Sequence, residues 1–179
     1  MGKLVSLAQA RSLRQELRRQ GKTVVFTNGV FDLLHVGHVR YLRAARELGD
    51  VLFVGLNSDS SVQKLKGRGR PLIAQAERAE VLCALSSVDY VVLFDELTAE
   101  RLVEALRPGL YAKGGDYADE AAATSEGPPA SDSRGEVLPE VSVVERYGGR
   151  VVIMPYVRGY STSEIVQRVL SGAERERGG

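Results

Sequence analysis

Between residues 23 and 38 the chain reads Thr23-Val24-Val25-Phe26-Thr27-Asn28-Gly29-Val30-Phe31-Asp32-Leu33-Leu34-His35-Val36-Gly37-His38. The first five residues form a β-rich apolar run, and both histidines of the protein stand at the end of the segment. The amphipathic stretch that follows, Val39 to Leu48, predicts a helix. A strand that turns through glycines into a helix start leaves backbone N–H groups pointing outward, which suits an anion. With two imidazoles added, the segment predicts a phosphate-handling site.

The composition is typical of a globular enzyme. At 179 residues the chain is long enough for one compact domain, and 44% of its residues are hydrophobic and 26% charged. Its net charge of +1 offers no electrostatic attraction for nucleic acid. The sequence shows neither a signal-peptide pattern nor a membrane-spanning run, so we expect a cytoplasmic protein with no membrane partner.

Apolar runs and amphipathic segments alternate along the whole chain. A capping box at Ser6 and Gln9 predicts a first helix over about residues 6–19. Strands predicted at residues 23–27, 51–55, 90–93, 110–112 and 151–154 alternate with helices at 39–48, 75–85 and 99–106. Strands that are apolar at every position and separated by helices indicate a parallel sheet covered on both faces. The sequence therefore predicts a single Rossmann-like α/β domain over residues 1–179, with a doubly wound parallel sheet.

One segment interrupts this alternation. Residues 118–139 are small, polar and broken by prolines, and they offer little apolar surface to bury. This composition favours a flexible insertion over an ordered arm. The charged, glycine-ended tail from Ser171 to Gly179 is expected to fray.

Chemically useful side chains follow the predicted strands. Because ligands of parallel sheets gather at the carboxyl ends of strands near a topological switch point, these positions are site candidates. Asn57-Ser58-Asp59 follows the second strand, Lys113-Gly114-Gly115-Asp116 the fourth, and Tyr160-Ser161-Thr162-Ser163 the fifth. Between them we expect a basic, glycine-rich loop from Lys64 to Pro71. This collection of groups suits a nucleoside triphosphate and a second phosphorylated substrate.

Each of these segments also has a structural interpretation. The two histidines could belong to an ordinary helix start, or could share a metal that a carboxylate would have to complete. The segment 64–71 could be a loop of solvated charge, and Lys113 to Asp116 a plain turn. Ser161 to Glu164 forms a capping box for the last helix, although the same hydroxyls could hold a phosphate.

Two further charged residues have open roles. Arg78, with Glu77 and Glu80 nearby in the sequence, is either a phosphate contact or a member of a surface ion pair. Asp32 is expected to orient the glycine turn through local hydrogen bonds, with a magnesium contact as the weaker alternative.

Gly29 to His38 matches the signature G-x-F-D-x-x-H-x-G-H of the cytidylyltransferase-like nucleotidyltransferases, which the chain resembles from about Leu7 to Leu170. The resemblance is strongest to the adenylyltransferase half of the bifunctional heptose-phosphate enzymes of lipopolysaccharide precursor synthesis. Glycerol-phosphate and ethanolamine-phosphate cytidylyltransferases share the same frame. The segments that resemble the heptose branch are Thr27-Asn28-Gly29, Asn57-Ser58-Asp59, Leu65-Lys66-Gly67, Gly69-Arg70-Pro71, Lys113-Gly114-Gly115-Asp116-Tyr117, Tyr147-Gly148-Gly149 and Ser161-Thr162.

The resemblance implies in-line attack of an acceptor phosphate on the α-phosphorus of a nucleotide, with release of pyrophosphate. It implies transfer of AMP from ATP to a sugar 1-phosphate, expected to be D-glycero-D-manno-heptose 1-phosphate, with Mg2+ held by the triphosphate. The enzymatic alternative is a CTP-dependent transferase for glycerol 3-phosphate or a related alcohol phosphate, and the non-enzymatic alternative is a nucleotide-binding regulatory module. No sugar-kinase half is matched, so another protein is expected to phosphorylate the acceptor. A homodimer is expected because dimers are common in the family.

The resemblance also implies a role for individual residues. The predicted catalytic residues are His35, His38 and Lys66. The predicted nucleotide contacts are Asn28, Gly29, Val30, Phe31, Gly37, Arg70, Lys113, Ser161 and Thr162. The predicted acceptor or phosphate contacts are Asp32, Asn57, Asp59, Arg78, Gly115 and Asp116. No residue is assigned as a metal ligand.

Overall fold

The strands form one parallel sheet. The computed structural model describes residues 1–115, 138–155 and 162–177. Its strands are β1 (Lys3–Leu4), β2 (Val24–Gly29), β3 (Val51–Asn57), β4 (Tyr90–Phe94), β5 (Leu110–Gly115) and β6 (Arg150–Pro155). They lie in the order β1-β4-β3-β2-β5-β6, and every neighbouring pair is parallel. The predicted doubly wound parallel sheet is confirmed.

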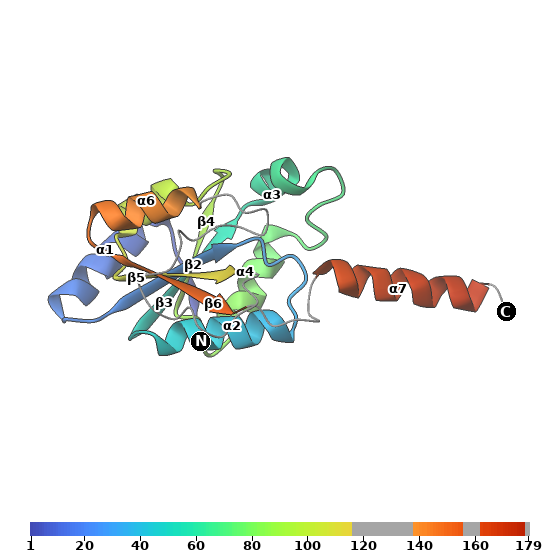
Figure 1. Ribbon diagram of the computed structural model, residues 1–179, viewed down its shortest axis with the longest axis horizontal. Coiled ribbons are helices and arrows are strands. Elements are labelled where there is room, and N and C mark those ends of the chain that lie inside the picture. The colour runs from blue at the N-terminus through green and yellow to red at the C-terminus, as the bar shows by residue number, and fades with distance from the viewer. Residues whose placement is uncertain (116–137, 156–161, 178–179) are drawn as a thin grey trace.

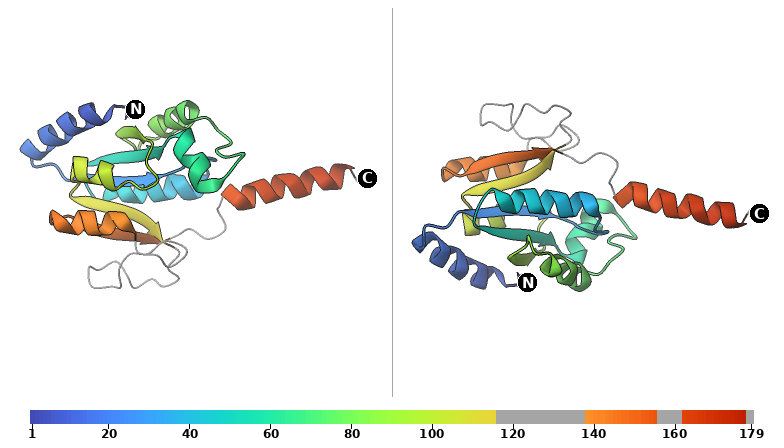
Figure 2. Two further views of the ribbon diagram at one scale, coloured as in Figure 1. Left: turned by 90° about the horizontal axis from the view of Figure 1, so that it is seen from above. Right: turned by 90° about the horizontal axis from the view of Figure 1, so that it is seen from below.

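The described residues also form helices on both sides of this sheet. The helices are α1 (Leu7–Arg19), α2 (Val36–Glu47), α3 (Asp59–Lys66), α4 (Gln75–Ala84), α5 (Glu100–Leu106), α6 (Pro139–Arg146) and α7 (Thr162–Arg177). In Figure 1, α6 lies above the sheet and α2 below it, while α7 extends away from it, as Figure 2 also shows. None of the described helices is long and apolar enough to cross a membrane.

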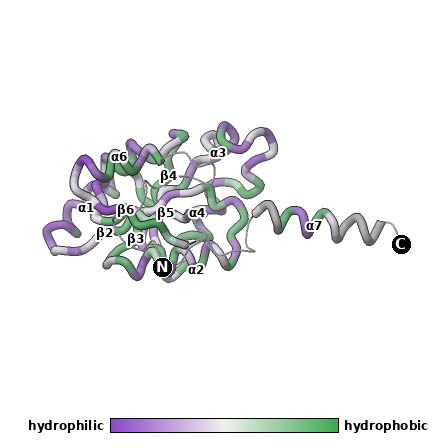
Figure 3. Tube along the Cα trace, viewed as in Figure 1, coloured by the Kyte–Doolittle hydropathy of each residue, from purple (hydrophilic) through white to green (hydrophobic). Residues whose placement is uncertain are grey.

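Side chains of successive residues in β2 build a separate core on each face of the sheet. Val24 and Phe26 pack on one face with residues of α1, α5 and α6. Val25 packs on the other face with residues of α2 and α4. Figure 3 shows hydrophobic residues along the strands and hydrophilic residues on the outer turns of α1. An apolar residue at every strand position is therefore required, because both faces are buried.

The order of the strands reverses between β2 and β5. β2 pairs with β3 on one side and with β5 on the other; β4 and β1 extend the first half of the sheet and β6 extends the second. The carboxyl ends of β2 and β5 point to the same end of the molecule, the end at which α3 lies (Figure 1). Open parallel sheets bind ligands at this kind of switch point.

Several element boundaries differ from the prediction. The edge strand β1 is not predicted, and α2 begins three residues before Val39. Residues 64–66, predicted as loop, form the last turn of α3, so the loop begins at Gly67. Pro139, the last residue of the predicted insertion, is instead the first residue of α6. Residues 118–137 of that insertion lie outside the described residues. The helix α7 continues to Arg177 instead of fraying from Ser171.

Candidate active site

The two histidines lie directly after β2, at the N-terminus of α2. His35 is the N-cap residue of this helix and His38 belongs to its first turn. Their rings stack with centroids 3.8 Å apart and planes inclined by 29°. The ring of Phe31 meets the His38 ring edge-on, with centroids 5.3 Å apart. Two imidazoles and the N–H groups of a helix start therefore belong to one turn at the switch point.

Gly29 and Phe31 explain how the turn brings these groups together. Phe31 has a left-handed backbone, with φ at 48°, a conformation that costs an L-residue about 1 to 2 kcal/mol. Its ring is buried, which offsets that cost. A Cβ atom at Gly29 would lie 3.0 Å from ring atom Cε2 of Phe31. Glycine at this position therefore lets the Phe31 ring lie against the strand end, where the ring supports His38.

The imidazole of His38 is neutral at pH 7 in the free protein. Burial and the neighbouring His35 lower the pKa of His38 from 6.5 to about 4. Its Nδ1 atom is buried and has no hydrogen-bond partner within the part of the chain that the structure describes. A polyanion bound beside this ring would favour the protonated form and would raise the pKa again.

We expect the free protein to lose stability as the pH falls from about 6.5 to about 4. In this range the unfolded chain binds a proton at His38 and the folded protein does not, so the free energy of unfolding increases with pH. Urea unfolding midpoints over this pH range check the prediction, with His38→Gln as the variant that lacks the titrating group. The wild type should show the steeper dependence on pH, and equal slopes would contradict a lowered pKa.

Asn28 and Lys113 meet across the switch point. The Tyr111 hydroxyl and the Lys113 ammonium group both donate hydrogen bonds to Oδ1 of Asn28, at 2.7 and 3.2 Å. Burial raises the pKa of Tyr111, so its hydroxyl keeps the proton that it donates. Two predicted nucleotide contacts, from β2 and from β5, are thus held together.

Tyr41 ties α2 to the same place. Its hydroxyl lies 2.6 Å from Oγ1 of Thr27 and donates to the carbonyl oxygen of Ala112 at 3.0 Å. Neither Tyr41 nor Tyr111 is predicted as a site residue from the sequence. The available signal is a hydroxyl-bearing side chain among apolar positions, because a buried hydroxyl needs a partner.

The predicted basic residues lie on α3 and on the loop that follows it, residues 67–73. Lys66 is exposed at the end of α3, and Arg70 is half-buried in the loop. Both cations therefore lie in the segment of the chain between β3 and α4. Lys64 is exposed in the same turn as Lys66.

Asp32 binds this loop to the segment that carries both histidines, residues 30–38, which we call the histidine turn. Its Oδ2 accepts a hydrogen bond from Arg70 at 2.7 Å, and its Oδ1 accepts from the backbone N–H groups of Leu72 and Ile73 at 2.7 and 3.0 Å. Burial disfavours the charged carboxylate, but Arg70 and the backbone donors outweigh it, so the pKa of Asp32 lies below its ordinary value. The expectation of local hydrogen bonds is wrong: these partners come from a distant loop.

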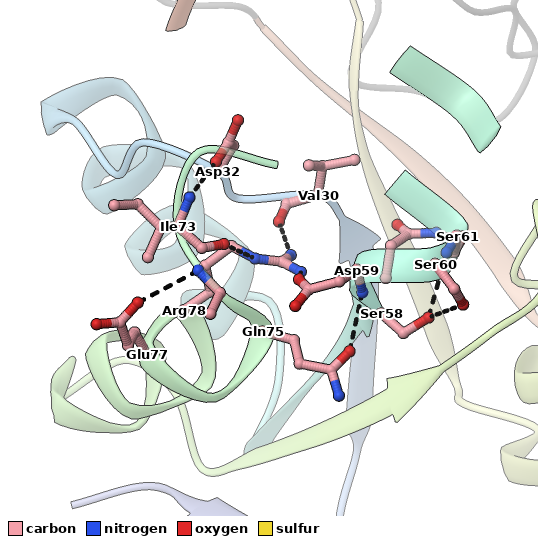
Figure 4. Close-up of polar contacts among 12 residues, drawn as sticks. Val30, Asp32, Ser58, Asp59, Ser60, Ser61, Ile73, Gln75, Glu77 and Arg78 are labelled. Atoms are coloured by element: carbon pink, nitrogen blue, oxygen red, sulfur yellow. Dashed lines mark hydrogen bonds and ion pairs between the residues drawn. The ribbon is translucent and has the colours of Figure 1, made fainter. Parts of the chain in front are cut away.

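Arg78 lies inside the protein. Its side chain is fully buried; Nε donates to the carbonyl oxygen of Ile73 at 2.9 Å, one Nη to that of Val30 at 2.5 Å, and the other to Oδ1 of Asp59 at 2.7 Å. Figure 4 shows the guanidinium group between these three acceptors. The interpretation as a surface ion pair is wrong, because the residue is buried and its partner is not a glutamate of its own helix. As a phosphate contact Arg78 remains a prediction.

Three other predicted site residues lie at the end of a strand or at the start of a helix. The Asn57 side chain is buried at the end of β3 and donates to Oγ of Ser61 at 3.0 Å. Gly115 ends β5 and Thr162 begins α7. Asp116 and Ser161 lie outside the described residues.

The described residues do not fit a protein-built metal cage. They contain no group of three or more histidine, cysteine, aspartate and glutamate side chains that could hold a metal ion. Two carboxylates of the candidate site, Asp32 and Asp59, are paired with Arg70 and Arg78. A divalent cation at this edge would need most of its ligands from a bound substrate and water.

Comparisons with known sequences place this geometry in a family. The sequence model of the cytidylyltransferase-like family matches residues 26–168. The bifunctional protein HldE of Syntrophotalea carbinolica is 51% identical over 167 residues, which cover 92% of this chain and 31% of the relative. The bifunctional protein HldE of Geobacter metallireducens is 52% identical, covering 86% of this chain and 28% of the relative. The chain thus spans roughly a third of the length of these relatives.

Solved structures agree with the sheet. The lipopolysaccharide core biosynthesis protein from Thermoplasma volcanium aligns with a TM-score of 0.56 at 26% identity, covering 79% of this chain and 100% of that one. The pantoate-beta-alanine ligase from Francisella tularensis aligns with a TM-score of 0.58 at 12% identity, covering 88% of this chain and 68% of that one. At this low identity, the ligase supports the fold alone.

Proposed function

Because the chain belongs to the cytidylyltransferase-like family of nucleotidyltransferases, we propose that it transfers AMP from ATP to a sugar 1-phosphate and releases pyrophosphate. The acceptor in this proposal is D-glycero-D-manno-heptose 1-phosphate, and the product is ADP-heptose. The observation that carries the reaction is the stacked pair of His35 and His38 at the switch point. The identity of about half of the residues with HldE proteins supports the choice of substrates.

The reaction is a displacement at phosphorus that needs no protein nucleophile. An acceptor phosphate oxygen forms a bond to the α-phosphorus of ATP while the bond from that phosphorus to the bridging oxygen breaks. The electron pair of the broken bond remains on the pyrophosphate that leaves. Catalysis then consists of positioning the two substrates and stabilising the growing charge on the leaving group.

The residues at the carboxyl edge are suited to both tasks. His35 and His38 supply N–H donors to the departing pyrophosphate, and the helix start adds its own N–H groups and dipole. Because His38 is neutral in the free protein, a proton taken up with the polyanion would strengthen its donor. Lys66 and Arg70 would bind the phosphates as cations.

Mg2+ belongs to this proposal as the counter-ion of the triphosphate, held by phosphate oxygens and water. A homodimer remains part of the proposal too, and light scattering of the purified protein at several concentrations tests it.

The decisive experiment is a pyrophosphate-release assay with the purified protein. ATP and CTP are each crossed with heptose 1-phosphate, glycerol 3-phosphate, ethanolamine phosphate and other sugar 1-phosphates. We expect the highest kcat/KM for ATP with heptose 1-phosphate. A strong preference for CTP with an alcohol phosphate would instead support the cytidylyltransferase alternative. Nucleotide binding with no turnover on any acceptor would support a regulatory module.

A further inference from the structure

One side chain, Arg78, is bonded to both ends of the segment that carries the basic residues. We call residues 59–73, which comprise α3 and the following loop, the basic excursion. It holds four cationic side chains, and Figure 3 shows hydrophilic stretches in its loop. Arg78 donates to Asp59 at the first residue of the basic excursion and to Ile73 at its last. The four cationic residues between these two anchors are Lys64, Lys66, Arg68 and Arg70.

The third bond of Arg78 joins this base to the histidine turn. Its remaining Nη donates to the carbonyl oxygen of Val30, the first residue after β2. Figure 4 shows the three acceptors around one planar group. They come from the turn after β2, from the start of α3 and from the segment before α4. One guanidinium group therefore fixes three segments of the candidate site relative to one another.

Two neighbouring side chains, Gln75 and Asp32, strengthen this closure. Gln75 accepts a hydrogen bond from the backbone N–H of Asp59 at 2.8 Å. Asp32 accepts from Arg70 and from the backbone of Leu72, inside the basic excursion, and so adds a second tie to the histidine turn. Both ends of the basic excursion are thus held, while Lys64 and Lys66 are exposed.

The chemistry of these contacts requires arginine. Three acceptors lie in different directions around one buried cation, and a guanidinium group offers N–H donors in a fixed planar fork. A lysine ammonium group is a point charge on a flexible stem and cannot reproduce that fork. Loss of the guanidinium would leave carbonyl oxygens without their donor and would leave Asp59 without its ion pair.

We propose that Arg78 is a positioning residue that locks the base of the basic excursion to the histidine turn, so that Lys66 and Arg70 approach the nucleotide phosphates as one preorganised unit. The inference rests on the proposed function for its kinetic consequence only. Arg78 acts through the basic excursion and needs no contact with substrate. Preorganisation of this kind reduces the cost of ordering a loop when its ligand binds.

The test compares Arg78→Lys with Leu82→Ala in the full chain. Leu82 is a fully buried residue of the same helix that packs in the core on the α2 face of the sheet, and its truncation weakens the protein without removing any of the three bonds of Arg78. Amide hydrogen exchange without ligand reports the opening of each segment. We expect Arg78→Lys to increase exchange within residues 59–73 about tenfold or more, and exchange in β3 much less. Leu82→Ala should increase exchange broadly, with no excess in the basic excursion.

Kinetics provide a second readout. Arg78→Lys should raise the KM for ATP about tenfold, whereas Leu82→Ala should leave this KM unchanged for the folded fraction. Should Arg78→Lys fail to fold, Asp59→Asn removes the ion pair alone and should increase exchange at the start of α3. If exchange in Arg78→Lys or Asp59→Asn increases as evenly along the chain as in Leu82→Ala, the inference is overturned. A wild type without transferase activity would refute the proposed function. The exchange experiment would still test the role of Arg78, because it needs no substrate.

Discussion

The His38→Ala variant is expected to release pyrophosphate about a thousandfold more slowly than the wild type. The ring of this residue is stacked on His35 and supported by Phe31, so it is held in one orientation before any ligand arrives. A donor that is already oriented stabilises the charge of the leaving group without reorganisation, and alanine removes that donor completely. Initial rates of pyrophosphate release at saturating ATP and acceptor measure the effect.

The matched control for this variant is Val39→Ala. Val39 follows His38 in the first turn of α2, and it is 41% exposed, so its truncation changes the same turn without removing an imidazole. We expect its rate to stay within about threefold of the wild type. Urea midpoints of both variants show whether the fold is intact. Turnover of His38→Ala close to that of Val39→Ala would exclude the proposed role of the imidazole.

The second large effect is expected for Lys66→Ala, which should lower kcat/KM about a hundredfold. Lys66 is exposed at the end of α3, within the basic excursion whose first and last residues are both bonded to Arg78. A cation placed there compensates the charge that grows on the pyrophosphate, and alanine leaves that charge to water. Steady-state kinetics with ATP and heptose 1-phosphate measure the loss.

Lys64→Ala provides the comparison, since both lysines are exposed in the last turn of α3. Residues two apart on a helix point about 200° away from each other, so both cannot face the same ligand. The Lys64 variant should therefore keep its kcat/KM within about threefold of the wild type. A larger loss for Lys64→Ala than for Lys66→Ala would show that Lys64, and not Lys66, contacts the phosphates.

The central strands could be predicted because their signal is local. Residues 51–55 and 90–93 are apolar at nearly every position, and they lie in β3 and β4. A strand that is buried on both faces needs such a run whatever its neighbours are. β1 could not be predicted in this way, because its two residues are too few to show any periodicity.

The two helices that are not predicted from the sequence, α3 and α6, carry weaker local signals. In α3, the cap is Ser58, whose side chain accepts from the N–H of Ser61, and Asp59 in the first turn favours the helix dipole. These signals could have been found, but the helix has little apolar surface to give it a periodic pattern. α6 begins with Pro139, a common first residue of helices, yet its valines favour a strand. Packing of α6 against the sheet overrides that preference.

The amino-acid sequence alone establishes the parallel sheet and the histidine turn at its edge, because hydrophobic periodicity and turn chemistry act between residues close in the chain. The role of Arg78 depends on the tertiary structure. Its three acceptors lie 5, 19 and 48 residues away, and nothing near it in the sequence indicates that they converge. Burial of a charged group is favourable only where such partners are assembled around it, and that assembly exists only in the folded chain.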